Sequence, residues 1–346
     1  MFKRSLPKPI FIILLVPLLM MCGHARKTAE TPKKSIFDDP LGRYPNSAFI
    51  AAVGSGDTQE AAKERAISDV AKVIEVDINA QQQLVEEYLE SGTADDMQLQ
   101  RKSSFSRQIN LTTQQSLKNV NIGKTWMSNE DGRYYAVAYL DRMETAEIYK
   151  QELATIDQQV SDYYTESQKA PEKLNQLAYI NKAISLAVQR DAMASQLNTI
   201  SQGLDTFTPT ISPSKLAKTR RLITQNITVK PELTFEKYEE FPGAVGEVLQ
   251  AFGFQLTNGE PDVLVTGSLK MEQLERQGYF VRWSVDLHFK DAASNTEFLT
   301  YTDDDREGST SYGEAERRAA IRMSSAIKKK LYDRLQDYFD SLVASK

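Results

Sequence analysis

The side chains that most often carry out chemistry in proteins are scarce in this chain. It has one cysteine, Cys22, and two histidines, His24 and His288. A Ser-His-Asp catalytic site would depend on one of these imidazoles, and no Gly-x-Ser-x-Gly motif accompanies them. Two histidines are also too few for a histidine-rich zinc site. The sequence therefore predicts a protein that is not an enzyme, with no catalytic residue, no metal site and no cofactor.

A run of carboxylates lies close to the C-terminal end of the chain. Asp303-Asp-Asp305 and Glu307 offer the oxygen ligands that hard cations take, but their spacing fits no EF-hand. We expect them in a solvated turn between the last strand and the final helix. The rival hypothesis is a hydrolase that uses Asp303 and Asp305, which requires a pocket there and a raised pKa on one carboxylate.

Two further patterns have both a functional and a structural interpretation. Gly54-Ser-Gly56 superficially resembles a dinucleotide-binding turn, but that motif needs a third glycine at position 59, where this chain has Gln59. We therefore expect a tight turn into a helix. The predicted last helix is rich in lysine and arginine, with acidic residues among them. We expect an ordinary solvated face there, and contact with an acidic partner or phospholipid head groups is the alternative.

Aromatic residues gather around one predicted hairpin. They are Trp126, Tyr134, Tyr135 and Tyr139. Packing in or near the core is the default expectation for such residues, and a groove for a carbohydrate or a protein partner is the alternative. These four residues are the candidate partner-binding site.

Residues 10–22 predict where the protein is delivered. A basic segment with Lys3, Arg4 and Lys8 precedes about a dozen apolar residues, too few to span a bilayer and typical of a secretory signal over residues 1–21. Leu19 lies three residues before Cys22, which resembles the lipobox of bacterial lipoproteins. In that family the cysteine is acylated, for example with palmitate. A rival cut after Ala25 would release a soluble periplasmic protein.

The mature chain is long enough for more than one hydrophobic core. About 320 residues remain after the signal, which predicts two domains. Residues 22–43 are polar and charged and form a tether, followed by an N-terminal α/β domain over 44–142. A helical connector covers 143–205, and a C-terminal α/β domain covers 206–346. The net charge of −5 gives no indication of nucleic-acid binding.

The N-terminal domain is predicted to pack a helix on a sheet. Residues 48–53 read as a short buried strand, and Asp57 can cap the next helix, with Glu60 completing a capping box. Its apolar stripe comprises Ala62, Ala66, Val70, Val73, Ile74 and Ile78.

Two further strands are predicted over 120–127 and 133–141, joined by a turn-forming loop. Both faces of the second strand are apolar or small, so we expect a central strand covered on both sides, with helices as the covering elements. Residues 81–92 and 103–118 are compatible with helix or strand.

The remainder of the chain predicts a helical hairpin and a layered domain. Helical periodicity over 143–205 breaks at Ala170-Pro171. Strands are then expected over 222–229, 254–256, 263–271, 279–289 and 297–301, with helices over 243–252 and 312–342. Alternation over 279–289 places Trp283 on the buried face and His288 on the polar face. The predicted class is α+β, with mainly antiparallel sheets in two layered domains.

Residues 45–142 resemble the Lpp-twenty family of bacterial envelope lipoproteins. The resemblance rests on Ala48-Phe-Ile-Ala-Ala-Val-Gly54, on an alanine-rich helix, and on the ending Gly132-Arg-Tyr-Tyr-Ala-Val-Ala-Tyr-Leu-Asp-Arg142 after Trp126. This domain type is also similar to the N-terminal domain of flagellar assembly protein T. A weaker resemblance to the amino-terminal domain of TolB covers Pro261–Gly267 and Trp283–Phe289. These families imply assembly or scaffolding by protein contacts.

The sequence thus predicts a non-enzymatic lipoprotein, anchored through Cys22 on the periplasmic face of the outer membrane. Its expected partners are proteins of the envelope or of a flagellar-type machine, and a homo-oligomer is among the options. The alternative is a soluble periplasmic protein that binds peptidoglycan or another glycan through Trp126 and its neighbouring tyrosines.

Overall fold

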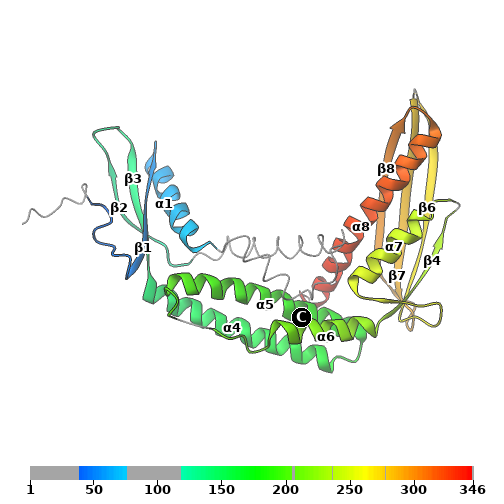
Figure 1. Ribbon diagram of the computed structural model, residues 1–346, viewed down its shortest axis with the longest axis horizontal. Coiled ribbons are helices and arrows are strands. Elements are labelled where there is room, and N and C mark those ends of the chain that lie inside the picture. The colour runs from blue at the N-terminus through cyan, green and yellow to red at the C-terminus, as the bar shows by residue number, and fades with distance from the viewer. Residues whose placement is uncertain (1–38, 76–117, 205–206, 236, 277, 345–346) are drawn as a thin grey trace, which may run out of the picture. The chain divides into compact units, whose positions relative to one another are not determined.

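The computed structural model describes residues 39–75, 118–204, 207–235, 237–276 and 278–344. Within these ranges the chain forms two β-sheets and six helices (Figure 1), which confirms the predicted α+β class. The signal segment, Cys22 and most of the predicted tether lie outside the described residues, as do the stretches between 81 and 117 that are compatible with helix or strand.

The first sheet is antiparallel and has three strands. They are β1 (Phe49–Gly56), β2 (Asn121–Met127) and β3 (Tyr134–Asp141), in the order β1-β3-β2. The prediction that the third of these strands is central is confirmed. Its alternate residues Ala136, Ala138 and Leu140 are fully buried, because they face the helix that follows β1.

That helix, α1 (Gln59–Ile74), covers one face of the sheet through Ala62, Ala66, Val70 and Ile74. It lies so close to β1 that a Cβ atom at Gly54 would stand 2.8 Å from the Cα of Ala66. Gly54 therefore belongs to the strand and permits close packing, which corrects the predicted turn at 54–56. In the described residues a helix packs against this face alone.

The start of α1 and the edge of its stripe also differ from prediction. Thr58, not Asp57, is the N-cap, and its hydroxyl accepts a hydrogen bond from the Ala61 amide at 3.2 Å. The one-residue shift removes the predicted capping box, since Glu60 no longer occupies the third helical position. Val73 is 51% exposed, so the stripe is narrower than its apolar residues suggest.

Two long helices follow, as predicted for the connector. They are α4 (Arg142–Lys169) and α5 (Lys173–Ile200), and they pack on each other as a hairpin. Ala170 leaves the helical conformation with φ −58° and ψ 132°, because the residue before a proline is pushed towards extended geometry. The buried residues of α5 lie all around it, since it also contacts later helices.

The second sheet has five strands in the order β5-β4-β6-β7-β8. Their bounds are β4 (Thr228–Thr234), β5 (Gln255–Leu256), β6 (Val263–Arg276), β7 (Gly278–Asp291) and β8 (Glu297–Ser309). The three long strands are antiparallel, as predicted, but β4 pairs in parallel with both β5 and β6. The helices of this part are α6 (Pro213–Gln225), α7 (Glu240–Phe252) and α8 (Tyr312–Ala344).

Helix α6 replaces part of a predicted strand. The sequence predicts a strand from Leu222, whereas the helix runs to Gln225 and the strand begins at Thr228. Ser212 caps this helix by accepting from the Lys215 amide, and Pro213 occupies its first turn. Serine followed by proline is typical of a helix start, so Ser212 and Pro213 together account for the beginning of α6.

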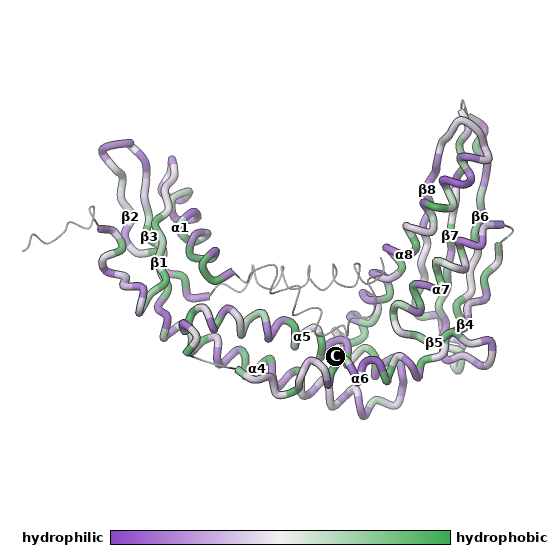
Figure 2. The backbone as a smooth tube through the Cα atoms, in the orientation of Figure 1, coloured by the Kyte–Doolittle hydropathy of each residue, from purple (hydrophilic) through white to green (hydrophobic). Residues whose placement is uncertain are grey.

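The buried face of the second sheet follows the predicted alternation. Val281, Trp283, Val285, Leu287 and Phe289 of β7 are all buried, and α8 packs against β7 and β8 on this side. Figure 2 shows hydrophobic positions recurring along β7, α7 and α8. Apolar residues of this sheet and its helices belong to one cluster of buried residues, which also includes residues of α1, α4 and α5.

The acidic run lies in a strand and not in the expected turn. Residues 303–307 belong to β8 and pair with β7 over the full run. Asp303, Asp305 and Glu307 alternate along the strand, as Leu299 and Tyr301 do before them, and they reach cations of α8: Asp303 pairs with Lys330 at 2.7 Å, and Arg322 lies 4.0 Å and 3.9 Å from the other two.

Candidate functional site

Three of the four predicted aromatic residues share the sheet face opposite α1. Trp126 and Tyr135 are cross-strand partners in β2 and β3, and their rings stack with centroids 5.5 Å apart and planes 14° apart. Tyr139 lies further along β3 on the same face, because residues two and four apart in a strand point the same way. We call Trp126, Tyr135 and Tyr139, with Tyr44 and Phe49, the aromatic face.

The loop tip of the hairpin holds the Tyr135 ring in position. Its hydroxyl donates a 2.6 Å hydrogen bond to Asp131, whose other oxygen accepts from the Arg133 amide at 3.1 Å. The bond to Tyr135 lowers the pKa of Asp131 and raises the pKa of Tyr135. Trp126 and Tyr135 are both half-buried, so this ring pair remains in reach of a partner molecule.

The other end of the aromatic face is closed by the residues that precede β1. The Tyr44 ring lies 4.5 Å from that of Tyr139 and 5.6 Å from that of Phe49. It also covers Gly123 of β2, where a Cβ atom would stand 3.3 Å from the tyrosine Cζ. Burial is the main cause that raises the pKa of Tyr44. Tyr139 is therefore a packing residue, and the accessible part of the face is at Trp126 and Tyr135.

Tyr134 does not belong to this face. It precedes Tyr135 by one position and so points to the other side of the sheet, where it packs against the buried core. This corrects the predicted group of four, because residues adjacent in a strand point to opposite faces of the sheet.

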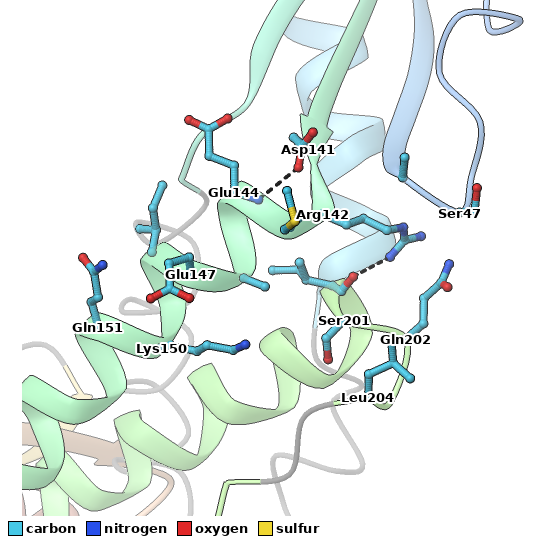
Figure 3. Close-up of a pocket in the computed structure, with 15 residues that line it drawn as sticks. Ser47, Asp141, Arg142, Glu144, Glu147, Lys150, Gln151, Ser201, Gln202 and Leu204 are labelled. Atoms are coloured by element: carbon cyan, nitrogen blue, oxygen red, sulfur yellow. Dashed lines mark hydrogen bonds between the residues drawn. The ribbon is translucent and has the colours of Figure 1, made fainter.

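A second feature, a recess, lies where β3 meets the helical hairpin (Figure 3). It has a volume of about 860 Å³ and is lined by the start of α4 and the residues after α5. Met143 and Leu204 line it and are 82% and 87% exposed. Glu144, Glu147 and Lys150 add charge to its lining. An apolar recess with charged neighbours suits an apolar side chain of a protein partner.

Arg142 organises this recess, a role that the sequence does not predict. Its guanidinium donates to the carbonyls of Thr199 and Ile200 at 3.0 Å and 2.8 Å, at the end of α5. A cation here also suits the partial negative charge of a helix C-terminus. Burial lowers the pKa of Arg142. The feature of the sequence that could have pointed to Arg142 is its position at the end of the Tyr-Tyr-Ala-Val-Ala-Tyr-Leu-Asp-Arg motif.

The part of the chain that carries the aromatic face matches a known family: residues 41–141 match the LPP20 lipoprotein family. The match spans the aromatic face and ends one residue before Arg142, in agreement with the resemblance seen in the sequence. We call residues 41–141 the LPP20 domain. None of the curated proteins compared with this chain matches it.

Solved structures that resemble the chain come from several bacteria. A secreted protein of Helicobacter pylori is 15% identical, with a TM-score of 0.43, covering 82% of this chain and 97% of its own. A minor lipoprotein of Acinetobacter baumannii is 12% identical, with a TM-score of 0.24, covering 31% and 90%. A lipoprotein of Neisseria meningitidis is 9% identical, with a TM-score of 0.20, covering 29% and 96%.

Outside the LPP20 domain, the predicted carboxylates face cations. Asp303 accepts from Lys330 on the α8 side, and Asp304 on the outer side lies 3.3 Å from Arg282. A depression of about 570 Å³ on that outer side is lined by Asp303 and Asp304 and also by Lys270 and Arg282. In the described ranges, no three histidine, cysteine or acidic side chains gather as a metal site would require.

His288 lies on the polar face of β7, as predicted. Its ring nitrogens are 3.1 Å from Glu297 and 3.1 Å from Asp286. The hydrogen bond with Glu297 is the main cause that raises the pKa of His288. The side chains of Asp286 and Glu297 are 50% and 41% exposed, so these contacts lie at the surface. Of the helices that the structure describes, none has the length and apolar composition to cross a bilayer.

Proposed function

We propose that this chain is a non-enzymatic lipoprotein of the bacterial envelope that acts by binding other proteins during the assembly of an envelope structure. The observation that carries the proposal is the match of residues 41–141 to the LPP20 lipoprotein family, downstream of a predicted signal peptide over residues 1–21 that is followed by Cys22. The proposed location is the periplasmic face of the outer membrane, and flagellar-type machines are among the candidate partners.

In this proposal an acylated Cys22 is the membrane anchor. A single acyl chain binds membranes only marginally, whereas a cysteine with several chains anchors stably. The chain from Cys22 to Asp39 can span at most about 60 Å, so the LPP20 domain stays near the membrane. Such tethering raises the effective concentration of the domain for a partner in the same envelope layer.

Metabolic labelling with an alkyne fatty acid tests the anchor. We expect label on the wild-type chain and none on Cys22→Ser, together with a shift of the variant from the membrane to the periplasmic fraction. Intact mass separates the two predicted cleavage sites, since cutting after Ala25 removes the cysteine. An unlabelled wild-type chain that begins at Arg26 would contradict the anchor and favour a soluble periplasmic protein.

The aromatic face supplies the proposed contact surface. Trp126 and Tyr135 present a stacked, half-buried ring pair beside the hairpin tip, and aromatic residues are enriched at protein interfaces. A photo-crosslinking residue at position 126 should give protein adducts in intact cells. The matched control replaces Ser294, in the exposed β7–β8 turn, and should give none. Equal labelling from both positions would contradict a specific contact at the aromatic face.

The same ring pair supports one alternative function, binding of a glycan such as peptidoglycan. Flat, accessible aromatic rings suit sugar rings as well as protein side chains. A pull-down on purified sacculi distinguishes the two. Binding that Trp126→Ala abolishes, with the far-ultraviolet circular dichroism unchanged, would favour the glycan; no binding by the wild-type chain would remove this alternative.

The absence of catalysis is also a proposal, and the ion pairs of Asp303 and Asp304 support it. A carboxylate that is paired with a lysine or arginine is a poor general acid, because the cation stabilises its ionised form. Purified protein should not hydrolyse ester, glycoside or phosphate substrates. Turnover that disappears in Asp303→Asn but persists in Asp69→Asn, a surface control on α1, would contradict this part of the proposal.

A further inference from the structure

Within the described ranges, the open strand edges carry features that discourage pairing, with one exception. Unpaired backbone groups along an edge invite another strand, and proteins block them with charges, prolines and bulges. The outer strand β8 bears the charged run 303–307, and β2 has a register shift with Lys124 inside it. Strand β4, beyond its short pairing with β5, carries Lys230, Pro231 and Glu232.

Strand β1 has none of these features. Its eight residues, Phe-Ile-Ala-Ala-Val-Gly-Ser-Gly, include no charge and no proline, and its register with β3 is unbroken from Phe49 to Gly56. In the part of the chain that the structure describes, no strand pairs with its other side. Among the described residues, this edge therefore offers its outward backbone groups to a further strand.

The orientation of the backbone shows which groups are available. The carbonyl of Ala48 accepts from the Arg142 amide at 2.9 Å, so even-numbered residues direct their backbone groups to β3. Ala51, Val53 and Ser55 therefore direct theirs outward, since neighbouring residues alternate. The Phe49 amide already donates to the Pro45 carbonyl at 2.9 Å. Tyr44 covers the aromatic face, not this edge, which leaves three residues for pairing.

We propose that β1 pairs with β1 of a second copy of this chain, antiparallel and around a two-fold axis. A neutral strand is complementary to itself, because antiparallel pairing brings no like charges together. A two-fold axis perpendicular to the sheet joins two three-stranded sheets into one of six. It also places both α1 helices on one side and both aromatic faces on the other. The pair would thus present two copies of the proposed contact surface together.

Sedimentation equilibrium of the full chain with Cys22→Ser, purified from the periplasm, tests this inference independently of lipidation. We expect a dimer at micromolar concentration. Val53→Lys and Val53→Glu each place like charges across the two-fold axis and should raise the dimer dissociation constant at least tenfold. Mixing the two variants should restore a dimer, now of one Lys and one Glu chain, because opposite charges then face each other.

The matched control is Met127→Lys, on the other edge of the same sheet, where the side chain is 53% exposed. It should leave the dimer unchanged. If Val53→Lys does not fold, as judged by circular dichroism, Ser55→Lys provides a milder charge on the same edge. A wild-type chain that is monomeric at every concentration, including one that takes up a strand from another protein, would overturn the inference. So would a dimer that both charged variants leave intact.

Discussion

Arg142 holds Asn46, 96 residues earlier in the chain, through two hydrogen bonds. Nε donates to the Asn46 backbone carbonyl at 2.8 Å, and Nη2 donates to its side-chain oxygen at 2.9 Å. Gln202 donates to the same carbonyl at 3.0 Å. One guanidinium thus joins the segment before β1, the start of α4 and the end of α5, which fixes the recess beside them.

Substitution of Arg142 should destabilise the protein. Arg142→Ala removes four hydrogen bonds, to Asn46, Thr199 and Ile200, so we expect the free energy of unfolding to fall by about 1–3 kcal/mol. Urea denaturation followed by circular dichroism measures this. The control is Arg133→Ala, whose ion pair with Asp57 at 3.5 Å is exposed and should contribute less than about 0.5 kcal/mol. Equal losses in the two variants would show that the Arg142 contacts are not formed in solution.

Gly54 should tolerate no side chain. A Cβ atom there meets the backbone of α1, which cannot yield as a flexible side chain would, so Gly54→Ala should lower stability by about 1–3 kcal/mol. Gly243→Ala is the matched control: its Cβ meets nothing within 4 Å, and it lies in α7. This second change should raise stability by up to about 1 kcal/mol. A neutral Gly54→Ala would contradict the close packing of α1 on β1.

The buried ion pair of the helical hairpin should contribute strongly. Arg190 of α5, with 3% of its side chain exposed, donates to Asp157 of α4 at 3.1 Å and to Asp191 at 2.9 Å. Arg190→Met would remove the guanidinium that pairs with Asp157 and Asp191, at an expected cost of about 3–5 kcal/mol. Lys72→Met removes an exposed pair with Asp69 and should cost less than about 0.5 kcal/mol. Thermal unfolding of both variants tests the contrast.

His288 should make stability depend on pH near neutrality. Its pKa is raised in the folded protein, mainly by Glu297, so its contribution is fully present below the unfolded pKa, about 6.5. That contribution is lost as pH rises through the higher folded pKa. Proton NMR of the imidazole should show this raised pKa, and Glu297→Gln should lower it. Identical titrations of the two proteins would contradict the 3.1 Å contact.

Local patterns were sufficient for much of the fold. Alternating residues of β7 predicted which side of the sheet is buried, and small residues on both faces of β3 predicted its central position. The break at Ala170 followed from the proline after it. These predictions succeeded because burial and backbone restriction act within a few residues. The predicted strand was wrong over Leu222–Gln225, where Ile223 and Thr224 favour a strand by themselves but lie in a helix that packs on α5.

The candidate site depended more on contacts between distant segments. The sequence identified Trp126 and Tyr135 as candidates, but their stacking depends on the register between β2 and β3. Tyr134 does not belong to the aromatic face because adjacent residues of a strand point to opposite sides of the sheet. The role of Arg142 in the recess depends on its hydrogen bonds to Asn46 and Ile200, which are distant from it in the sequence. The match to the LPP20 family agrees with the resemblance in residues 45–142, whereas the similarity to flagellar assembly protein T remains a prediction.

Composition and spacing along single segments were enough to predict the helical hairpin and the alternation of the long strands, because each of these depends on neighbouring residues. The export signal and the lipid attachment at Cys22 come from the same kind of local pattern and stay predictions. Folding in three dimensions was needed to show that the acidic run 303–307 is a strand. Its carboxylates are balanced by Lys330 and Arg322 from α8, and a charge brought from a distant segment leaves no trace in the local pattern. For the same reason the sequence did not predict that β1 is an edge strand, because this depends on the order of the strands in the sheet.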